Sequence, residues 1–200
     1  RWQMKHPEAW KPTRRQLARI LVVRLSALGD IVLTGPAMAL LRETYPAADI
    51  DLLVDQPYAE IARALPGVTR VATSRAGLGG RYDLVIDFQN KLRSSVVCAL
   101  AAPIGVPRVR LAKWEVSGIV ARVRRRPIVI DQRRLYADAL SPWVDPTRLP
   151  PLRLGVTDAA RQAAASALAT HGLSSLSRLA LVFGTPSKPT KRYPHMESLI

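Results

Sequence analysis

Asp30 is the first residue in the chain whose type and position could do chemistry. Residues 20–23 form a short apolar run rich in β-branched types, which is typical of a strand buried in a parallel sheet. A turn over residues 26–30 follows, and apolar residues then recur at helical spacing. In open α/β sheets, ligands gather beyond the carboxyl end of such a strand. Asp30 is therefore placed to face a ligand.

Two starts of the following helix leave two roles for Asp30. The helix could begin at Asp30, which would then be an ordinary N-cap, with strain at Pro36. Alternatively, Gly35 caps the helix and Pro36 occupies its first position, which leaves Asp30 in the loop. Capping does not exclude catalysis, because one carboxylate could serve as both cap and base.

A second loop, residues 184–194, repeats this arrangement between a buried strand and a helix start. It brings together hydroxyl groups and the ammonium of Lys191, at a place where the helix dipole favours an anion; the hydroxyls belong to Thr185, Ser187 and Thr190. This predicts a phosphate-binding loop, although hydroxyls that merely cap the helix would give the same pattern. The residue order is not that of a P-loop, and no Gly-x-Gly-x-x-Gly follows a strand.

Composition limits the possible classes of protein. Two hundred residues, 48% of them hydrophobic, allow one large domain or one domain plus part of another. A net charge of +15 favours polyanionic partners such as nucleic acid, anionic lipid or a phosphorylated substrate. The single cysteine, Cys98, excludes an internal disulfide and lies in an apolar stretch typical of a core. No apolar run reaches the length of a membrane span, and residues 1–18 do not resemble a secretory signal.

Strands and helices alternate along the chain, and this predicts an α/β fold with a doubly wound parallel sheet. The predicted strands are residues 20–23, 49–54, 68–73, 82–88 and 105–110. Residues 112–140 are predicted to be helical and basic, and four prolines in residues 141–151 indicate a linker. The pattern then restarts with a helix capped by Thr157. We predict a basic tail (1–18), a first Rossmann-like domain (19–145), a linker (146–156) and the start of a second domain (157–200).

Three segments together resemble the ADP-heptose:lipopolysaccharide heptosyltransferases, glycosyltransferase family 9. They are Arg-Leu-Ser-Ala-Leu-Gly-Asp at 24–30, Tyr-Asp-Leu-Val-Ile-Asp-Phe-Gln-Asn at 82–90, and the loop from Gly184 to the Lys-Arg-Tyr-Pro at 191–194. Their order and spacing match the family over about residues 19–200. The resemblance implies a two-domain GT-B fold, in which this chain supplies the acceptor domain and an incomplete, truncated donor domain.

The resemblance also implies a reaction and roles for residues. Such enzymes transfer heptose from ADP-heptose to the lipopolysaccharide inner core, with inversion and without a required metal or other cofactor. Asp30 would be the general base that takes a proton from the acceptor hydroxyl. Lys191 and Ser187, with Thr185 beside them, would hold the donor diphosphate. Asp87, at the end of the fourth strand, is the alternative acid, although Asp is also common in turns.

The acceptor is expected to meet Asn90, Lys91 and Arg93, which open the helix after the fourth strand. The resemblance places an acceptor-binding basic residue near Arg93, and Arg suits Kdo carboxylates and lipid A phosphates. The basic stretch 122–134 could bind the same polyanion or the anionic membrane surface, or it could be a solvated helix face. We therefore expect a cytoplasmic, peripheral protein at the inner membrane, bound to a nucleotide-sugar donor and a lipopolysaccharide acceptor and not to nucleic acid.

Some features depart from the family pattern. The loop over residues 74–80 is short and nearly uncharged where relatives that add the first heptose carry a longer basic and aromatic loop, and Tyr193 replaces the usual Trp. Because most of the donor domain is absent, the 200-residue piece alone is expected to be inactive. Two alternatives stay open: a non-enzymatic basic module that binds nucleic acid or another polyanion, and a relative that uses another nucleotide sugar.

Overall fold

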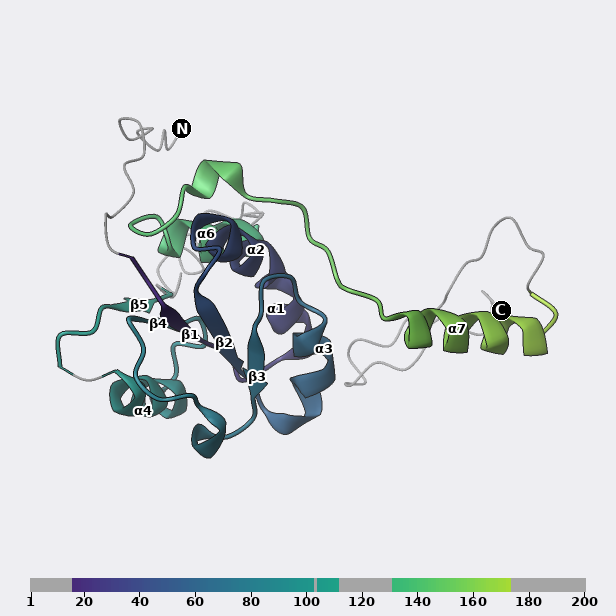
Figure 1. Ribbon diagram of the computed structural model, residues 1–200, viewed down its shortest axis with the longest axis horizontal. Helices are drawn as coiled ribbons and strands as arrows, with labels where there is room; N and C mark the ends of the chain where they lie inside the picture. Colours follow the sequence, from purple (N-terminus) through teal and green to yellow (C-terminus); the bar gives the residue numbers. More distant parts are fainter. Residues whose placement is uncertain (1–15, 103, 112–130, 174–200) are drawn as a thin grey trace, which may run out of the picture. The chain divides into compact units, whose positions relative to one another are not determined.

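The centre of the fold is a parallel five-stranded sheet with the strand order β3-β2-β1-β4-β5. The computed structural model describes residues 16–102, 104–111 and 131–173. The strands are β1 (Arg19–Val23), β2 (Asp49–Leu53), β3 (Arg70–Ala72), β4 (Leu84–Asp87) and β5 (Arg108–Arg110) (Figure 1). The predicted α/β class with a parallel sheet is therefore confirmed. β3 and β5 are shorter than predicted.

Helices follow β1, β2 and β4 as the alternating pattern predicts, whereas the connection from β3 to β4 contains only a 3₁₀ turn. They are α1 (Leu28–Leu33), α2 (Gly35–Thr44), α3 (Ala59–Arg63), α4 (Leu92–Ala101) and α6 (Gln132–Ala139), with short 3₁₀ turns η1 (Gln56–Tyr58), η2 (Arg75–Gly77) and η3 (Pro146–Arg148). The connection from β2 to β3 contains η1 and α3 in succession. Of the basic stretch 122–134, residues up to 130 lie outside the described part of the chain.

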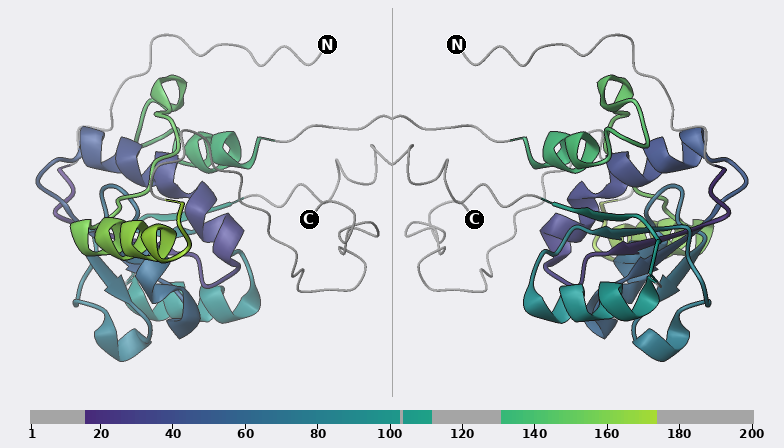
Figure 2. Two further views of the ribbon diagram at one scale, coloured as in Figure 1. Left: turned by 90° about the vertical axis from the view of Figure 1, so that its right-hand side faces the viewer. Right: turned by 90° about the vertical axis from the view of Figure 1, so that its left-hand side faces the viewer.

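The sheet is buried on both faces, which explains the continuous apolar runs of its central strands. Alternate residues of β1 enter two different clusters, because successive side chains of a strand point to opposite faces. Ile20 and Val22 pack with side chains of α2, α3 and α6, whereas Leu21 and Val23 pack with Cys98 and Ala102 beneath α4. Both views of Figure 2 show α2, in blue, and α4, in teal, on opposite sides of the strands.

The chain divides into two compact units, residues 1–155 and 156–200. The division falls inside the segment 146–156 that the prolines mark as a linker. In the second unit the structure describes α7 (Asp158–Thr170), whose N-cap is Thr157: its hydroxyl oxygen accepts a hydrogen bond from the Ala160 amide at 3.1 Å. The predicted cap is thus confirmed, and Gly172, with φ of 68°, follows the end of the helix. None of the described helices combines the length and apolar character needed to cross a membrane.

Candidate active site

The loops after β1, β2 and β4 meet at the carboxyl edge of the sheet and are bonded to one another. The Asp55 amide donates to the Leu25 carbonyl at 3.0 Å, and this ties the β2 loop to the β1 loop. The Ser26 amide donates to Oε1 of Gln89 at 3.2 Å, and this ties the β1 loop to the β4 loop. The position beyond three neighbouring strands is where open α/β sheets place their ligands.

Asp30 lies at this edge, in the first turn of α1 and not at its cap. The helix begins at Leu28, Ala27 is its N-cap, and no side chain caps it. The interpretation of Asp30 as an N-cap is therefore wrong, and so is the alternative that left it in a loop. A separate helix, α2, does begin next to Pro36, but its first residue is Gly35 and its N-cap is Thr34. The side chain of Asp30 is 41% exposed, so its carboxylate is accessible from solvent.

Arg24 holds the Asp30 carboxylate in place. It directly follows β1 and is buried, although it is charged. Its Nη2 forms an ion pair with Oδ2 of Asp30, and its Nη1 donates to the Phe88 carbonyl at 2.6 Å. The guanidinium also lies over the Tyr136 ring, 5.9 Å from its centroid, in cation–π geometry. Arg24 thus connects the candidate base to both β4 and α6.

Arg24 is the site residue that the sequence analysis missed. A charged residue at the end of an apolar strand was the available signal, since an arginine there needs buried partners. The partner could not be named, because the sequence left the start of the next helix, and with it the position of Asp30, open. The helix begins at Leu28, and the Asp30 carboxylate in its first turn pairs with the guanidinium.

Asp87 is buried, and its carboxylate is occupied within the loop after β4. Oδ1 accepts hydrogen bonds from the amides of Gln89 (3.1 Å) and Asn90 (2.8 Å), and Oδ2 accepts one from the Ser94 hydroxyl at 3.0 Å. These bonds bend the chain into α4, with Asn90 at φ of 46°. The geometry favours the turn role of Asp87 over that of the alternative acid.

The three predicted acceptor residues lie together at the start of α4, but their side chains differ in how accessible they are to a ligand. The side-chain amide nitrogen of Asn90, Nδ2, donates to the Leu111 carbonyl at 2.6 Å, which joins the loop to the end of β5. Lys91 is the exposed N-cap of α4. The Arg93 side chain is also exposed and forms two contacts with Asp55, of 2.8 Å and 3.1 Å. Lys91 and Arg93 are therefore available to an anionic ligand.

The predicted donor residues Thr185, Ser187 and Lys191 lie outside the described residues. Within the described ranges, the structure brings together no group of three or more His, Cys, Asp or Glu side chains that could hold a metal ion.

Three solved structures are similar to this chain over most of its length. A glycosyl transferase of family 9 from Veillonella parvula matches with a TM-score of 0.65 and 20% identity, covering 88% of this chain and 56% of that one. The fold is that of glycosyltransferase family 9. The Escherichia coli heptosyltransferase WaaC with ADP-2-deoxy-2-fluoro heptose matches at 0.52, with 20% identity and coverage of 88% and 62%. The E. coli ADP-heptose lps heptosyltransferase II matches at 0.51, with 22% identity and coverage of 78% and 51%.

One curated protein is also similar in sequence. The lipopolysaccharide heptosyltransferase 1 of Pseudomonas aeruginosa is 33% identical over 38% of this chain and 28% of its own length. No protein-family model matches the chain. The chain spans 28% of that relative's length and between 51% and 62% of the length of the three solved structures.

Proposed function

We propose that this chain is the acceptor-binding half, with the beginning of the donor half, of an inverting heptosyltransferase. It would move heptose from ADP-heptose to a Kdo or heptose hydroxyl of the lipopolysaccharide inner core. The observation that carries this proposal is Asp30: a carboxylate 41% exposed at the carboxyl edge of the sheet and held there by a buried arginine. The activities for which the similar proteins are named support the choice of sugar and acceptor.

Asp30 acts as the general base in the proposed mechanism. A sugar hydroxyl is a weak nucleophile, and a positioned carboxylate that takes its proton contributes about 10²–10⁴-fold to the rate. The anomeric carbon passes through an oxocarbenium-like state, and one displacement inverts its configuration. The departing ADP gains negative charge, which Lys191, with Thr185 and Ser187 beside it, stabilises. No metal or other cofactor is required in this scheme.

The acceptor approaches Asp30 past the start of α4. Lys91 and Arg93 are exposed there and carry the charge that Kdo carboxylates or lipid A phosphates require. Arg93 would exchange its exposed pair with Asp55 for the acceptor, at little cost, because exposed ion pairs contribute only up to about 1 kcal/mol. Asn90 shapes the loop that presents them. Because the acceptor is a lipid, we place the protein at the cytoplasmic face of the inner membrane.

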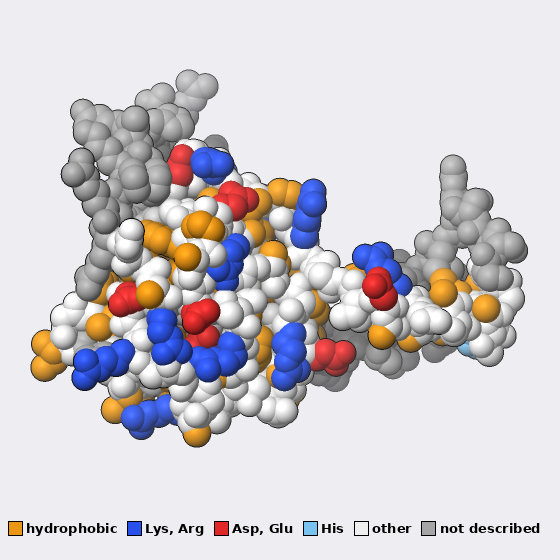
Figure 3. All heavy atoms as spheres, viewed as in Figure 1, with side chains coloured by type: hydrophobic (Ala, Val, Ile, Leu, Met, Phe, Trp, Pro, Cys, Tyr) orange, Lys and Arg blue, Asp and Glu red, His pale blue; other side chains and the backbone are white. Residues whose placement is uncertain are grey.

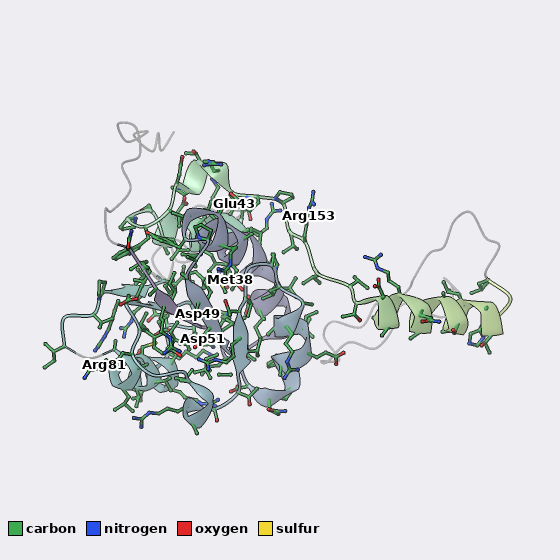
Figure 4. The ribbon with its side chains drawn as sticks, viewed as in Figure 1. Met38, Glu43, Asp49, Asp51, Arg81 and Arg153 are labelled. Carbon is green, nitrogen blue, oxygen red and sulfur yellow. The ribbon has the colours of Figure 1, made fainter. Side chains whose placement is uncertain are left out.

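The test uses the complete reading frame that contains this chain. Its product is incubated with ADP-heptose and a Kdo-bearing lipid A, and the acceptor is followed by mass spectrometry. We expect a gain of one heptose, and a loss of about 10²–10⁴-fold in kcat for Asp30→Asn with ADP binding unchanged. Asp49→Asn is the matched control: Asp49 is an exposed carboxylate at the amino end of β2 (Figure 4), and its loss leaves kcat unchanged.

The other results separate the alternatives. Unchanged transfer by Asp30→Asn would show that the assigned base is wrong. Binding of ADP without heptose transfer would point to a different sugar or acceptor. A protein that neither transfers nor binds ADP would leave the polyanion-binding module as the better interpretation.

A further inference from the structure

The outward face of α4 is apolar. Leu92, Val96 and Leu100 are 84%, 50% and 54% exposed, and Ile104, just beyond the helix, is fully exposed. Residues four apart lie on one side of a helix, so the three helical residues form a continuous stripe. The inward positions, in contrast, include Ser94, whose hydroxyl bonds to Asp87. A surface helix normally shows the reverse pattern, with its polar side outward.

The topology explains why no other helix covers this stripe in the described chain. The helices α2, α3 and α6 pack on one face of the sheet. The other face takes helical side chains from α4 alone within the described ranges, because the connection from β3 to β4 contains only η2. The stripe therefore lies at the flank of a face with a single helix.

Basic residues flank the stripe on both sides. Arg93 lies at one side of the helix. On the other side, Arg108 donates to the Ala102 carbonyl at 2.6 Å and Arg110 donates to the Ser95 hydroxyl at 2.8 Å, so both β5 side chains extend along α4. Residues 88–111 contain four basic residues and no acidic one. Figure 3 shows hydrophobic and basic side chains interspersed over this region, at the lower left.

We infer that the outward face of α4, with Leu92, Val96, Leu100, Ile104 and their flanking arginines, docks on an anionic lipid surface. Apolar side chains that enter the acyl boundary beside cations that meet headgroups are the pattern of interfacial helices. The inference rests on the proposed function in one respect, because an acceptor embedded in a membrane gives such a surface its use. The face that would contact the membrane includes the start of α4, where Lys91 and Arg93 would bind the acceptor.

Charge argues against the other occupants of the stripe. A second copy of this chain would bring another net charge of +15 against these arginines. The segment 112–130 of the same chain is also basic, with five basic residues and one acidic residue. Nucleic acid would match the arginines but would not cover an apolar stripe that contains no aromatic residue.

The experiment is flotation of the complete protein that contains this chain with vesicles of phosphatidylcholine, with and without phosphatidylglycerol. We expect binding to the anionic vesicles that weakens as salt is added. The double substitution Leu92→Ser with Leu100→Ser should lower the affinity on the order of tenfold or more. The matched control replaces Leu152 and Leu154, which are exposed apolar residues elsewhere, by serine and retains binding. Arg110→Gln should weaken binding and flatten its salt dependence, whereas Arg63→Gln, on α3, should not.

A site-specific label keeps the test valid if the double variant does not fold. A polarity-sensitive fluorophore on Val96→Cys should shift to the blue with anionic vesicles, and the same label on Arg63→Cys should not. Cys98 would stay unlabelled, because burial raises the pKa of its thiol to about 12.

Three results would overturn the inference. One is absence of binding to anionic vesicles. The second is a dimer by sedimentation velocity that Leu92→Ser with Leu100→Ser converts to monomer, which would assign the stripe to a second copy. The third is equal affinity of parent and double variant for vesicles. The vesicles contain neither donor nor acceptor, so a protein that transfers heptose but does not bind them refutes this inference alone. Binding without transfer refutes only the proposed reaction.

Discussion

At the scale of single residues, the candidate base depends on a neighbour six positions earlier. Arg24 is buried and reaches Asp30, the Phe88 carbonyl and the Tyr136 ring at once. Its planar guanidinium provides several donors in fixed directions, and this lets one side chain join three elements. The carboxylate is therefore positioned by the core and not by the loop around it.

Replacing Arg24 by Lys tests this positioning role. The single ammonium of lysine cannot donate in the several fixed directions of the guanidinium. We therefore expect kcat of the complete enzyme to fall while KM for ADP-heptose stays unchanged. Loss of a buried charged hydrogen bond should also lower the free energy of unfolding by about 1–3 kcal/mol. Arg148→Lys, at an exposed position, is the control and should change neither quantity. An unchanged kcat would show that Asp30 needs no such anchor.

Replacing Asp87 by Asn separates its two possible roles. The amide cannot accept all three hydrogen bonds, so we expect the free energy of unfolding to fall by about 1–3 kcal/mol and kcat per folded molecule to persist. Asp145→Asn is the control, since Asp145 accepts from Thr147 in a similar but exposed turn. A large loss of kcat at unchanged stability would instead make Asp87 the acid.

Sequence alone predicted where Asp30 and Asp87 would lie, because both follow buried strands, and strand ends can be found from apolar runs. It did not predict their partners. Whether a carboxylate caps a helix, closes a turn or pairs with an arginine depends on where the next helix begins. For Asp30, the helix begins two residues earlier, at Leu28, and this places the carboxylate in the first turn.

At the scale of elements, a buried polar cluster fixes the connection from β3 to β4. Tyr82 donates from its hydroxyl to Oδ2 of Asp51 at 2.6 Å and accepts from the Gly79 amide at 3.0 Å. Arg70 pairs with the same carboxylate. Asp51 lies in the middle of β2 (Figure 4), where the sequence predicted only a strand. A buried carboxylate needs such partners, and they come from segments that only the folded sheet brings together.

Tyr82→Phe should lower the free energy of unfolding at neutral pH by about 1–3 kcal/mol, because Asp51 loses a buried hydrogen bond. Burial, followed by the bond to Asp51, raises the pKa of Tyr82 from 10.0 to about 12. The folded protein thus keeps a proton that the unfolded chain releases, and this contribution is present below pH 10 and is lost as the pH rises towards 12. Urea unfolding of parent and variant across this range should show the difference shrinking. A difference independent of pH would contradict the assignment.

At the scale of the whole molecule, alternation of strands and helices was enough to predict the fold class, since parallel sheets require a crossover between strands. The sequence also indicated that no helix lies between β3 and β4, because the segment that joins them is short and rich in glycine. The apolar face of α4 was not predicted, because the stripe was interpreted as part of a core. Hydropathy alone cannot tell which side of an apolar helix faces the sheet.

The net charge of +15 gives a prediction for the whole chain. Any affinity for random duplex DNA should be electrostatic and should fall by about 10³-fold or more between about 50 and about 200 mM salt. Binding of ADP to the complete protein should persist over the same range, and Lys191→Ala should lower it. Fluorescence anisotropy with labelled DNA and with labelled ADP measures both. Salt-sensitive binding of DNA by a protein that does not bind ADP would favour the nucleic-acid module.

The strand order has a consequence for how the protein is made. β1 pairs with β2 on one side and with β4 on the other, and Arg24 bonds to the Phe88 carbonyl 64 residues further along the chain. While the ribosome is still adding that interval, β1 has an open edge, and the Arg24 guanidinium has no carbonyl from β4 to bond. Pairings this distant in sequence form slowly, and open apolar edges favour aggregation. The central strand is thus completed late in synthesis, and chaperones are expected to matter most in that interval.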